Sequence, residues 1–148
     1  MTWFVASNAG ALSPEQIARL ASYITRYAQT MGVTVHAVGG FVDHLHVVFD
    51  LPATQTLEKI AADLQKTTVR FLRESLGSPT FAWGGIHAVG ITDGTVDFVT
   101  AYVAENGARH QSGQIEYEWE PTNNMPSEPE DEVPAWLRDA IANKGRKD

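Results

Sequence analysis

The chain has 148 residues, 43% of them hydrophobic and 20% charged, a composition typical of one globular domain. It has no cysteine, which excludes disulfides and thiolate metal sites, and no apolar run near the ~20 residues of a membrane-spanning helix. The formal net charge of −7 argues mildly against a nucleic-acid partner, since affinity for nucleic acids usually rests on Lys and Arg. Because the N-terminus also lacks the pattern of a signal peptide, we expect a cytoplasmic protein with no membrane contact.

Acidic residues concentrate toward the C-terminus. The last 38 residues carry nine of the 18 acidic side chains but only four of the 11 basic ones. Residues 121–134 are also rich in Pro, Asn and Ser, which is typical of a flexible linker, and a short amphipathic helix is expected at 134–141. Before them, 116–120 alternates like an edge strand or extended arm. We therefore expect a folded domain over 1–111 and an acidic, Pro-rich tail over 112–148.

The first 110 residues alternate strand and helix patterns. Ser13 and Gln16 form a capping box around Pro14, which is a strong helix start, and Gly32 is expected to end this helix. The expected elements are, in order, a strand at 2–7, a helix at 13–32, a strand at 33–38, a hairpin turn at Gly39-Gly40, a strand at 41–50, a helix at 56–76, a strand at 86–91, and a helix at 96–106 ended by Gly107.

This order predicts an α+β fold of the ferredoxin-like, split βαβ type. In that fold two helices pack on one face of a four-stranded antiparallel sheet. Side chains alternate along a strand, so Leu45 and Val47 should face the two helices, while His44 and His46 share the opposite face. The helix at 96–106 is then the element available to cover the histidines.

His44 and His46 form a candidate metal site. Residues two apart on a strand stand side by side, roughly 6.5–7 Å apart at their Cα atoms. Their ring nitrogens can converge on one divalent ion, since imidazole is a frequent metal ligand. Two ordinary strand histidines, one of them facing solvent, would give the same short motif, and the motif alone does not separate these alternatives.

The helix at 56–76 carries a line of basic residues along its outer side, which we call the basic ridge. It is the only concentrated basic surface that the sequence predicts. Such a line is either a solvated helix face or a surface that contacts phosphates, and both remain open. The ridge consists of Lys59, Lys66, Arg70 and Arg73.

Four short motifs follow one another along residues 2–111. They are VDHLHVV at 42–48, LQK at 64–66, FAW at 81–83, and AYVAEN at 101–106 followed by Arg109-His110. Together, in this order and at this spacing, they resemble the single-tyrosine HUH transposases of the insertion-sequence-200-like group, including the REP-associated relatives.

The resemblance implies an enzyme that cuts and rejoins single-stranded DNA, with hairpin-containing ends, through a covalent 5′-phosphotyrosine. Tyr102 would be the nucleophile. His44, His46 and Asn106 would hold Mg²⁺ or Mn²⁺ on the scissile phosphate, with Asn106 standing where the family has a glutamine. The basic ridge would contact the DNA backbone. The resemblance also implies a homodimer in which the tyrosine helix of one subunit completes the histidine site of the other.

A competing hypothesis is a non-catalytic ferredoxin-like module that binds a nucleic acid or a protein. The presence of His44, His46, Tyr102 and an amide at position 106 favours the enzyme, whereas the negative net charge favours the module. The acidic tail is expected to lie over the basic ridge and to compete there with DNA.

Overall fold

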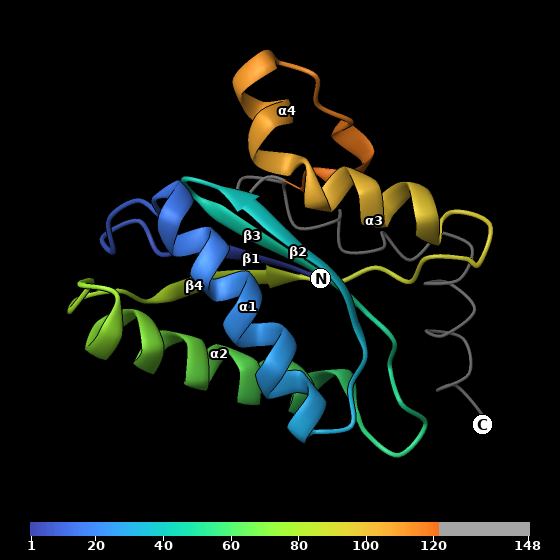
Figure 1. Ribbon diagram of the computed structural model, residues 1–148, viewed down its shortest axis with the longest axis horizontal. Coiled ribbons are helices and arrows are strands. Elements are labelled where there is room, and N and C mark those ends of the chain that lie inside the picture. The colour runs from blue at the N-terminus through green and yellow to red at the C-terminus, as the bar shows by residue number, and fades with distance from the viewer. Residues whose placement is uncertain (122–148) are drawn as a thin grey trace, which may run out of the picture.

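A four-stranded antiparallel sheet forms the centre of the protein, in a computed structural model that describes residues 1–121. Helices α1 and α2 cover one face of the sheet, and α3 and α4 lie over the other (Figure 1). The predicted α+β fold is therefore confirmed. The strands are β1 (Thr2–Val5), β2 (Val35–Phe41), β3 (His44–Phe49) and β4 (Trp83–His87), in the order β2-β3-β1-β4, and the helices are α1 (Pro14–Thr30), α2 (Leu57–Ser75), α3 (Val96–Ala104) and α4 (Asn106–Ser112).

The main core lies between the sheet and the layer of α1 and α2. Leu45 and Val47 of β3 point into it, at 0% and 1% exposure, as the strand alternation predicts. Each such buried aliphatic side chain contributes about 1.5–3 kcal/mol of hydrophobic stabilisation. A smaller apolar cluster lies on the opposite face, under α3, and consists of Ala37, Val48, Val99, Tyr102 and Val103.

The start of α1 is the predicted capping box. The Ser13 hydroxyl accepts a hydrogen bond from the Gln16 backbone N–H at 3.1 Å, and the Gln16 side-chain oxygen accepts one from the Ser13 N–H at 3.0 Å. The Gln16 amide also donates to the Leu76 carbonyl at 2.9 Å, which joins the start of α1 to the end of α2. None of the helices within residues 1–121 is long and apolar enough to cross a membrane.

The hairpin turn between β2 and β3 is not at Gly39-Gly40, as we expected, but at Val42-Asp43. The two glycines lie within β2, where Gly39 pairs with His46. Their role is close approach: a Cβ atom on Gly39 would lie 1.9 Å from the backbone oxygen of Val103 in α3, and one on Gly40 would lie 2.3 Å from the backbone oxygen of His44. Gly39 therefore lets α3 rest directly on the sheet.

Three further boundaries differ from the sequence-based expectation. The fourth strand comes earlier than 86–91, because Trp83 rather than Ile86 begins the pairing with β1. The expected helix at 96–106 is two helices that meet at Glu105, and Gly107 lies inside the second one. Residues 117–119 form a 3₁₀ turn rather than a strand. The helix expected at 134–141 falls outside the described residues.

The contact between α3 and the sheet gives a stability prediction. Gly39→Ala should lower the free energy of unfolding by about 1–3 kcal/mol, because the added methyl group must push the Val103 backbone away. Gly90→Ala is the matched control, since no atom lies within 4 Å of a Cβ built there. Urea denaturation of both variants measures the effect, and equal midpoints would contradict the close approach.

Candidate active site

His44 and His46 lie side by side on β3, on the sheet face that α3 and α4 cover. Their ring centroids are 4.8 Å apart, and their side chains are 7% and 5% exposed. Buried polar groups need partners, because an unpaired one costs free energy. The two rings are therefore part of an organised polar site.

The outer nitrogen of each ring is held by a neighbouring side chain. Asp43 Oδ1 lies 2.7 Å from Nδ1 of His44, and the Thr2 hydroxyl lies 2.8 Å from Nδ1 of His46. These contacts fix the orientation of both rings. The remaining nitrogens, the two Nε2 atoms, converge on one point: each lies 3.2 Å from Oε2 of Glu120.

Tyr102 and Asn106 reach the same point from α3 and from the start of α4. The Tyr102 hydroxyl donates to Oε1 of Glu120 at 2.7 Å, and the Asn106 amide nitrogen donates to the same oxygen at 2.5 Å. The Asn106 amide oxygen lies 3.2 Å from Nε2 of His44. The four site residues that we expected to act together, His44, His46, Tyr102 and Asn106, are thus brought together within one chain.

Sequence reasoning missed Glu120. Its carboxylate, 9% exposed, lies at the centre of the site and contacts all four predicted residues. The segment Glu116–Glu120 carries three glutamates at alternate positions, so a strand-like arm was a reasonable expectation. Glu120 directly follows the 3₁₀ turn at Tyr117–Trp119, and the sequence carries no signal for that turn.

The charges of the site are coupled. Burial alone would raise the pKa of Glu120, but hydrogen bonds from His44, His46 and Tyr102 outweigh it and lower the pKa. For His44, burial lowers the pKa, but Glu120 and Asp43 raise it more. Burial lowers the pKa of His46. Burial and the hydrogen bond to Glu120 raise the pKa of Tyr102 to about 12, so the phenol is neutral beside an ionised carboxylate.

The chemistry of the ring nitrogens fits a bound cation. Because Nδ1 of His44 faces the Asp43 carboxylate, a neutral His44 donates there and leaves Nε2 as a lone pair. That lone pair points at two oxygens, from Asn106 and Glu120, at 3.2 Å each. A proton or a cation must lie between these atoms. Imidazole nitrogen, amide oxygen and carboxylate oxygen are all ligand types of divalent cations, so these residues would fit one.

A third imidazole belongs to this cluster. His110 of α4 stacks on Phe41, with ring centroids 4.7 Å apart, and its Nε2 lies 3.3 Å from Oε1 of Glu120 without forming a hydrogen bond. His44, His110 and Glu120 each offer an atom that could bind a metal, all within 4.8 Å of one another. His110 is therefore a further candidate ligand.

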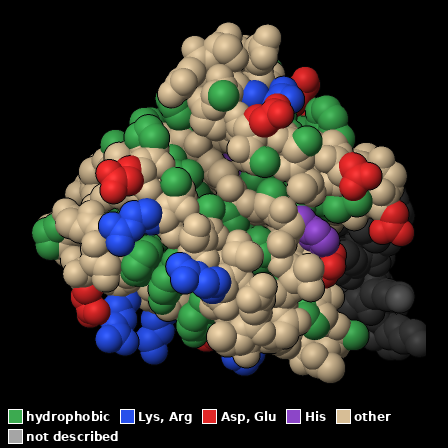
Figure 2. Space-filling model, in the orientation of Figure 1, with side chains coloured by type: hydrophobic (Ala, Val, Ile, Leu, Met, Phe, Trp, Pro, Cys, Tyr) green, Lys and Arg blue, Asp and Glu red, His purple; other side chains and the backbone are tan. Residues whose placement is uncertain are grey.

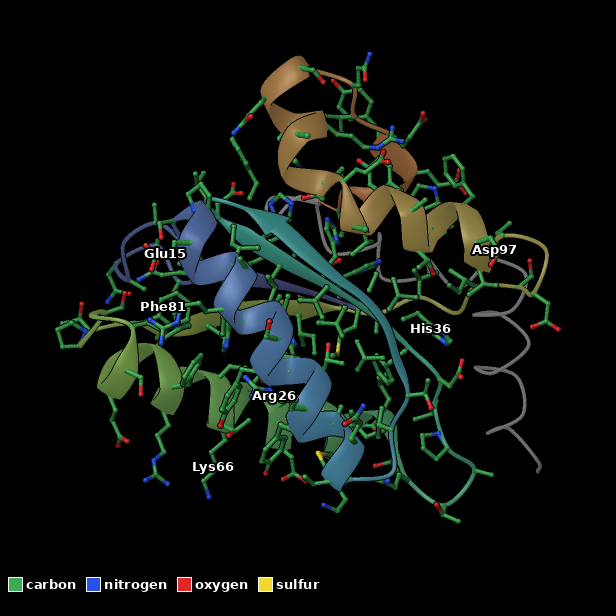
Figure 3. All side chains as sticks on the ribbon, in the orientation of Figure 1. Glu15, Arg26, His36, Lys66, Phe81 and Asp97 are labelled. Atoms are coloured by element: carbon green, nitrogen blue, oxygen red, sulfur yellow. The ribbon has the colours of Figure 1, made fainter. Side chains whose placement is uncertain are left out.

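A cavity of about 490 Å³ adjoins the histidines. Apolar side chains of β3 and α3, including Val48 and Val99, form much of its wall, and His46 and Trp119 border it. His36, labelled in Figure 3, is another lining residue at the sheet edge. The volume falls within the range of small-molecule pockets.

The basic ridge lies on the other side of the sheet from the histidine site. All four of its residues are on α2, which covers the opposite face of the sheet, and Lys66 points away from the sheet in Figure 3. Basic side chains are visible along the lower edge of the molecule in Figure 2. Two ridge residues form ion pairs on the helix, Lys59 with Asp63 at 2.7 Å and Arg70 with Glu74 at 3.0 Å. The structure does not bring the ridge to the histidine site.

A family model described as "Transposase IS200 like" matches residues 1–106. The chain belongs to the IS200-like transposase family. Membership confirms the resemblance seen in the motifs, and the family implies DNA binding and DNA processing in transposition. Comparison with curated proteins gives no match. The family match covers the histidine pair and Tyr102 and ends at Asn106, so Glu120 lies outside it.

A cation bound in this transposase should stabilise its fold. With Mn²⁺ at about 100 times its dissociation constant, we expect about 2.7 kcal/mol of added stability, seen as a higher melting temperature that EDTA reverses. His46→Gln should remove this shift. The matched control is His36→Gln, since His36 lies on β2 and pairs with Asp50 at 2.9 Å. Equal Mn²⁺ shifts in both variants would argue against the His44–His46 site.

Proposed function

We propose that this IS200-like transposase nicks and rejoins single-stranded DNA through a covalent 5′-phosphotyrosine, with Tyr102 as the nucleophile. One observation carries the proposal: the Tyr102 hydroxyl and the two imidazole Nε2 atoms contact opposite oxygens of a single carboxylate. A nucleophile and a cation-binding pair separated by one carboxylate are close enough to act on one phosphate group.

In cleavage, the phenolic oxygen loses its proton and forms a bond to phosphorus, while the bond to the 3′ oxygen breaks. The departing 3′ oxygen takes up a proton and is released as a 3′-hydroxyl. The link is reversible, because a phenol is a better leaving group than an alcohol, and rejoining reverses the step. A divalent cation held by His44, His46 and Asn106 would stabilise charge on the phosphate oxygens. His110 and Glu120 are additional groups that could hold it.

The substrate follows from the surroundings of the site. The cavity beside His46 has apolar walls and an aromatic neighbour, Trp119, which suit an unpaired base. Bases inside a duplex are stacked and paired, so only single-stranded segments offer such a group. With a net charge of −7, base contacts should contribute more to affinity than phosphate contacts do.

The basic ridge is proposed to contact the backbone of the same DNA. Lys66 and Arg73 line a hollow together with Trp83 at the start of β4, which places positive charge beside an aromatic ring. The Trp83 ring itself packs against Trp3 and Phe81, so the hollow offers positive charge rather than a free stacking surface.

Hairpin ends, the choice between Mg²⁺ and Mn²⁺, a homodimer and a cytoplasmic location stay predictions. A composite site is not needed to bring Tyr102 to the histidines, because all three residues meet within one chain.

A non-catalytic DNA-binding module is the second candidate function. The position of Glu120 favours it, because an ionised carboxylate stands between the tyrosine and the histidines, where a phosphate would have to enter. The division into a domain over 1–111 and a tail over 112–148 is also kept as a proposal, and it assigns Glu120 to the tail.

The nucleophile has a direct test. Incubation with hairpin-bearing single-stranded oligonucleotides and Mn²⁺ should give a covalent protein–DNA adduct, and Tyr102→Phe should abolish it because the attacking oxygen is gone. Tyr117→Phe, at a tyrosine that is 84% exposed, is the matched control and should retain the adduct. If the wild type forms no adduct on any such substrate, the binding module becomes the better account.

The ridge has its own test. Lys66→Ala should weaken single-strand binding about threefold and reduce the slope of log Kd against log salt by about 0.7, the value for one phosphate contact on a single strand. Arg26→Ala removes an exposed charge from α1 and is the control. Fluorescence anisotropy across a salt series measures both variants. Unchanged slopes would show that Lys66 does not contact the backbone.

A further inference from the structure

Glu120 joins the tyrosine to the histidines. Its Oε1 accepts hydrogen bonds from the Tyr102 hydroxyl at 2.7 Å and from the Asn106 amide at 2.5 Å. Its Oε2 lies 3.2 Å from Nε2 of both His44 and His46. A single side chain therefore sets the position of the hydroxyl relative to the imidazole pair.

The segment that carries Glu120 is anchored to α3 and α4. The Gln114 N–H donates to the Arg109 carbonyl at 2.9 Å, directly after α4. Trp119 packs against the apolar cluster under α3, and its N–H donates to the Glu116 carbonyl at 2.9 Å, which closes the 3₁₀ turn. Backbone hydrogen bonds and an apolar anchor thus hold the carboxylate in place.

The hydroxyl of Tyr102 is fixed from two sides by this segment. It donates to Glu120 and accepts a hydrogen bond from the Glu116 N–H at 3.2 Å. The ring itself is 0% exposed, and the Arg109 guanidinium lies 4.9 Å from its centroid. Packing alone confines the ring, but the direction of the hydroxyl depends on residues 116–120.

We propose that Glu120 is a positioning residue that holds the Tyr102 hydroxyl toward the imidazole pair for attack on the scissile phosphate. This inference rests on the proposed function. It adds a residue that the family match over 1–106 does not contain, because Glu120 comes 14 residues after that match ends. Reactions between a held nucleophile and a held phosphate lose rate steeply when the geometry is disturbed.

The kinetic test compares Glu120→Gln with Glu118→Gln in the full chain. Glu118 has an exposed side chain two residues earlier, so its variant controls for the loss of one charge from the same segment. Under single-turnover conditions with Mn²⁺ and a hairpin oligonucleotide, Glu120→Gln should slow adduct formation about 10- to 100-fold. Its Kd for the oligonucleotide should stay within about threefold of wild type, because a positioning role acts on the chemical step rather than on binding.

A Mn²⁺ titration separates positioning from cation binding. The slow rate of Glu120→Gln should persist at saturating Mn²⁺, whereas recovery at higher Mn²⁺ would assign Glu120 to the cation and overturn the proposal. Glu118→Gln should match wild type in the rate of adduct formation; its Kd is measured separately, because Glu118 lines the cavity beside His46. An unchanged rate in Glu120→Gln would overturn the proposal. A faster rate with tighter DNA binding would also overturn it, because it would show that the carboxylate competes with the phosphate. A weaker Kd with an unchanged rate would assign Glu120 to DNA binding.

A second readout does not require catalysis. With tyrosine labelled by ¹³C at Cζ, the Tyr102 signal is assigned by its loss in Tyr102→Phe. Glu120→Gln should shift this signal, whereas Glu118→Gln should not, because only Glu120 accepts the phenolic hydrogen bond among the contacts of residues 1–121. An unshifted signal overturns the positioning role even if no variant nicks DNA. Absence of adduct in the wild type, with the shift present, refutes the proposed function alone.

Discussion

The backbone contact between Gly39 of β2 and Val103 of α3 is the constraint on which the site depends. Without a side chain at Gly39, α3 rests directly on the sheet face that bears the histidines. Tyr102 precedes Val103 in the chain, so this contact also sets the height of the tyrosine above the sheet. A bulkier residue at position 39 would lift the helix and separate the hydroxyl from the imidazoles, with a cost in stability and in geometry together.

Electrostatics explains why the site is stable although it is buried. Glu120 is an ionised carboxylate in a nearly dry position, which is unfavourable unless donors surround it. Tyr102 and Asn106 supply two donors, and the two Nε2 atoms supply a proton or share a cation. The same coupling makes each member dependent on the others, since removing one partner from a buried ionic group leaves the rest unpaired. The negative charge of Glu120 is therefore balanced by donors within the site, although the chain as a whole is acidic.

Local signals in the sequence predicted much of the fold and the shared face of His44 and His46, whereas Tyr102 and Asn106 were expected only from the family resemblance. The capping box at Ser13 determines a helix start by itself. The alternation through Leu45 and Val47 determines a strand face, which places His44 and His46 on the other face.

Gly39 was misassigned to a turn because a glycine needed for close approach looks the same in sequence as one needed for a bend. Glu120 was missed because its inward orientation depends on tertiary contacts of Trp119, which no local pattern encodes.

The basic ridge and the histidine pair lie on opposite faces of the sheet, but the path between them along one sheet edge is short. β4 is an edge strand with mostly exposed residues, and it connects the two surfaces. Its first residue, Trp83, lines the hollow that contains Lys66 and Arg73, and its last, His87, lines the cavity beside His46. Five residues of strand span about 13 Å between their first and last Cα atoms. A single strand of DNA that contacts both surfaces, as proposed above, would need only to follow this edge without crossing the helical layers, with basic side chains at one end and the cavity beside His46 at the other.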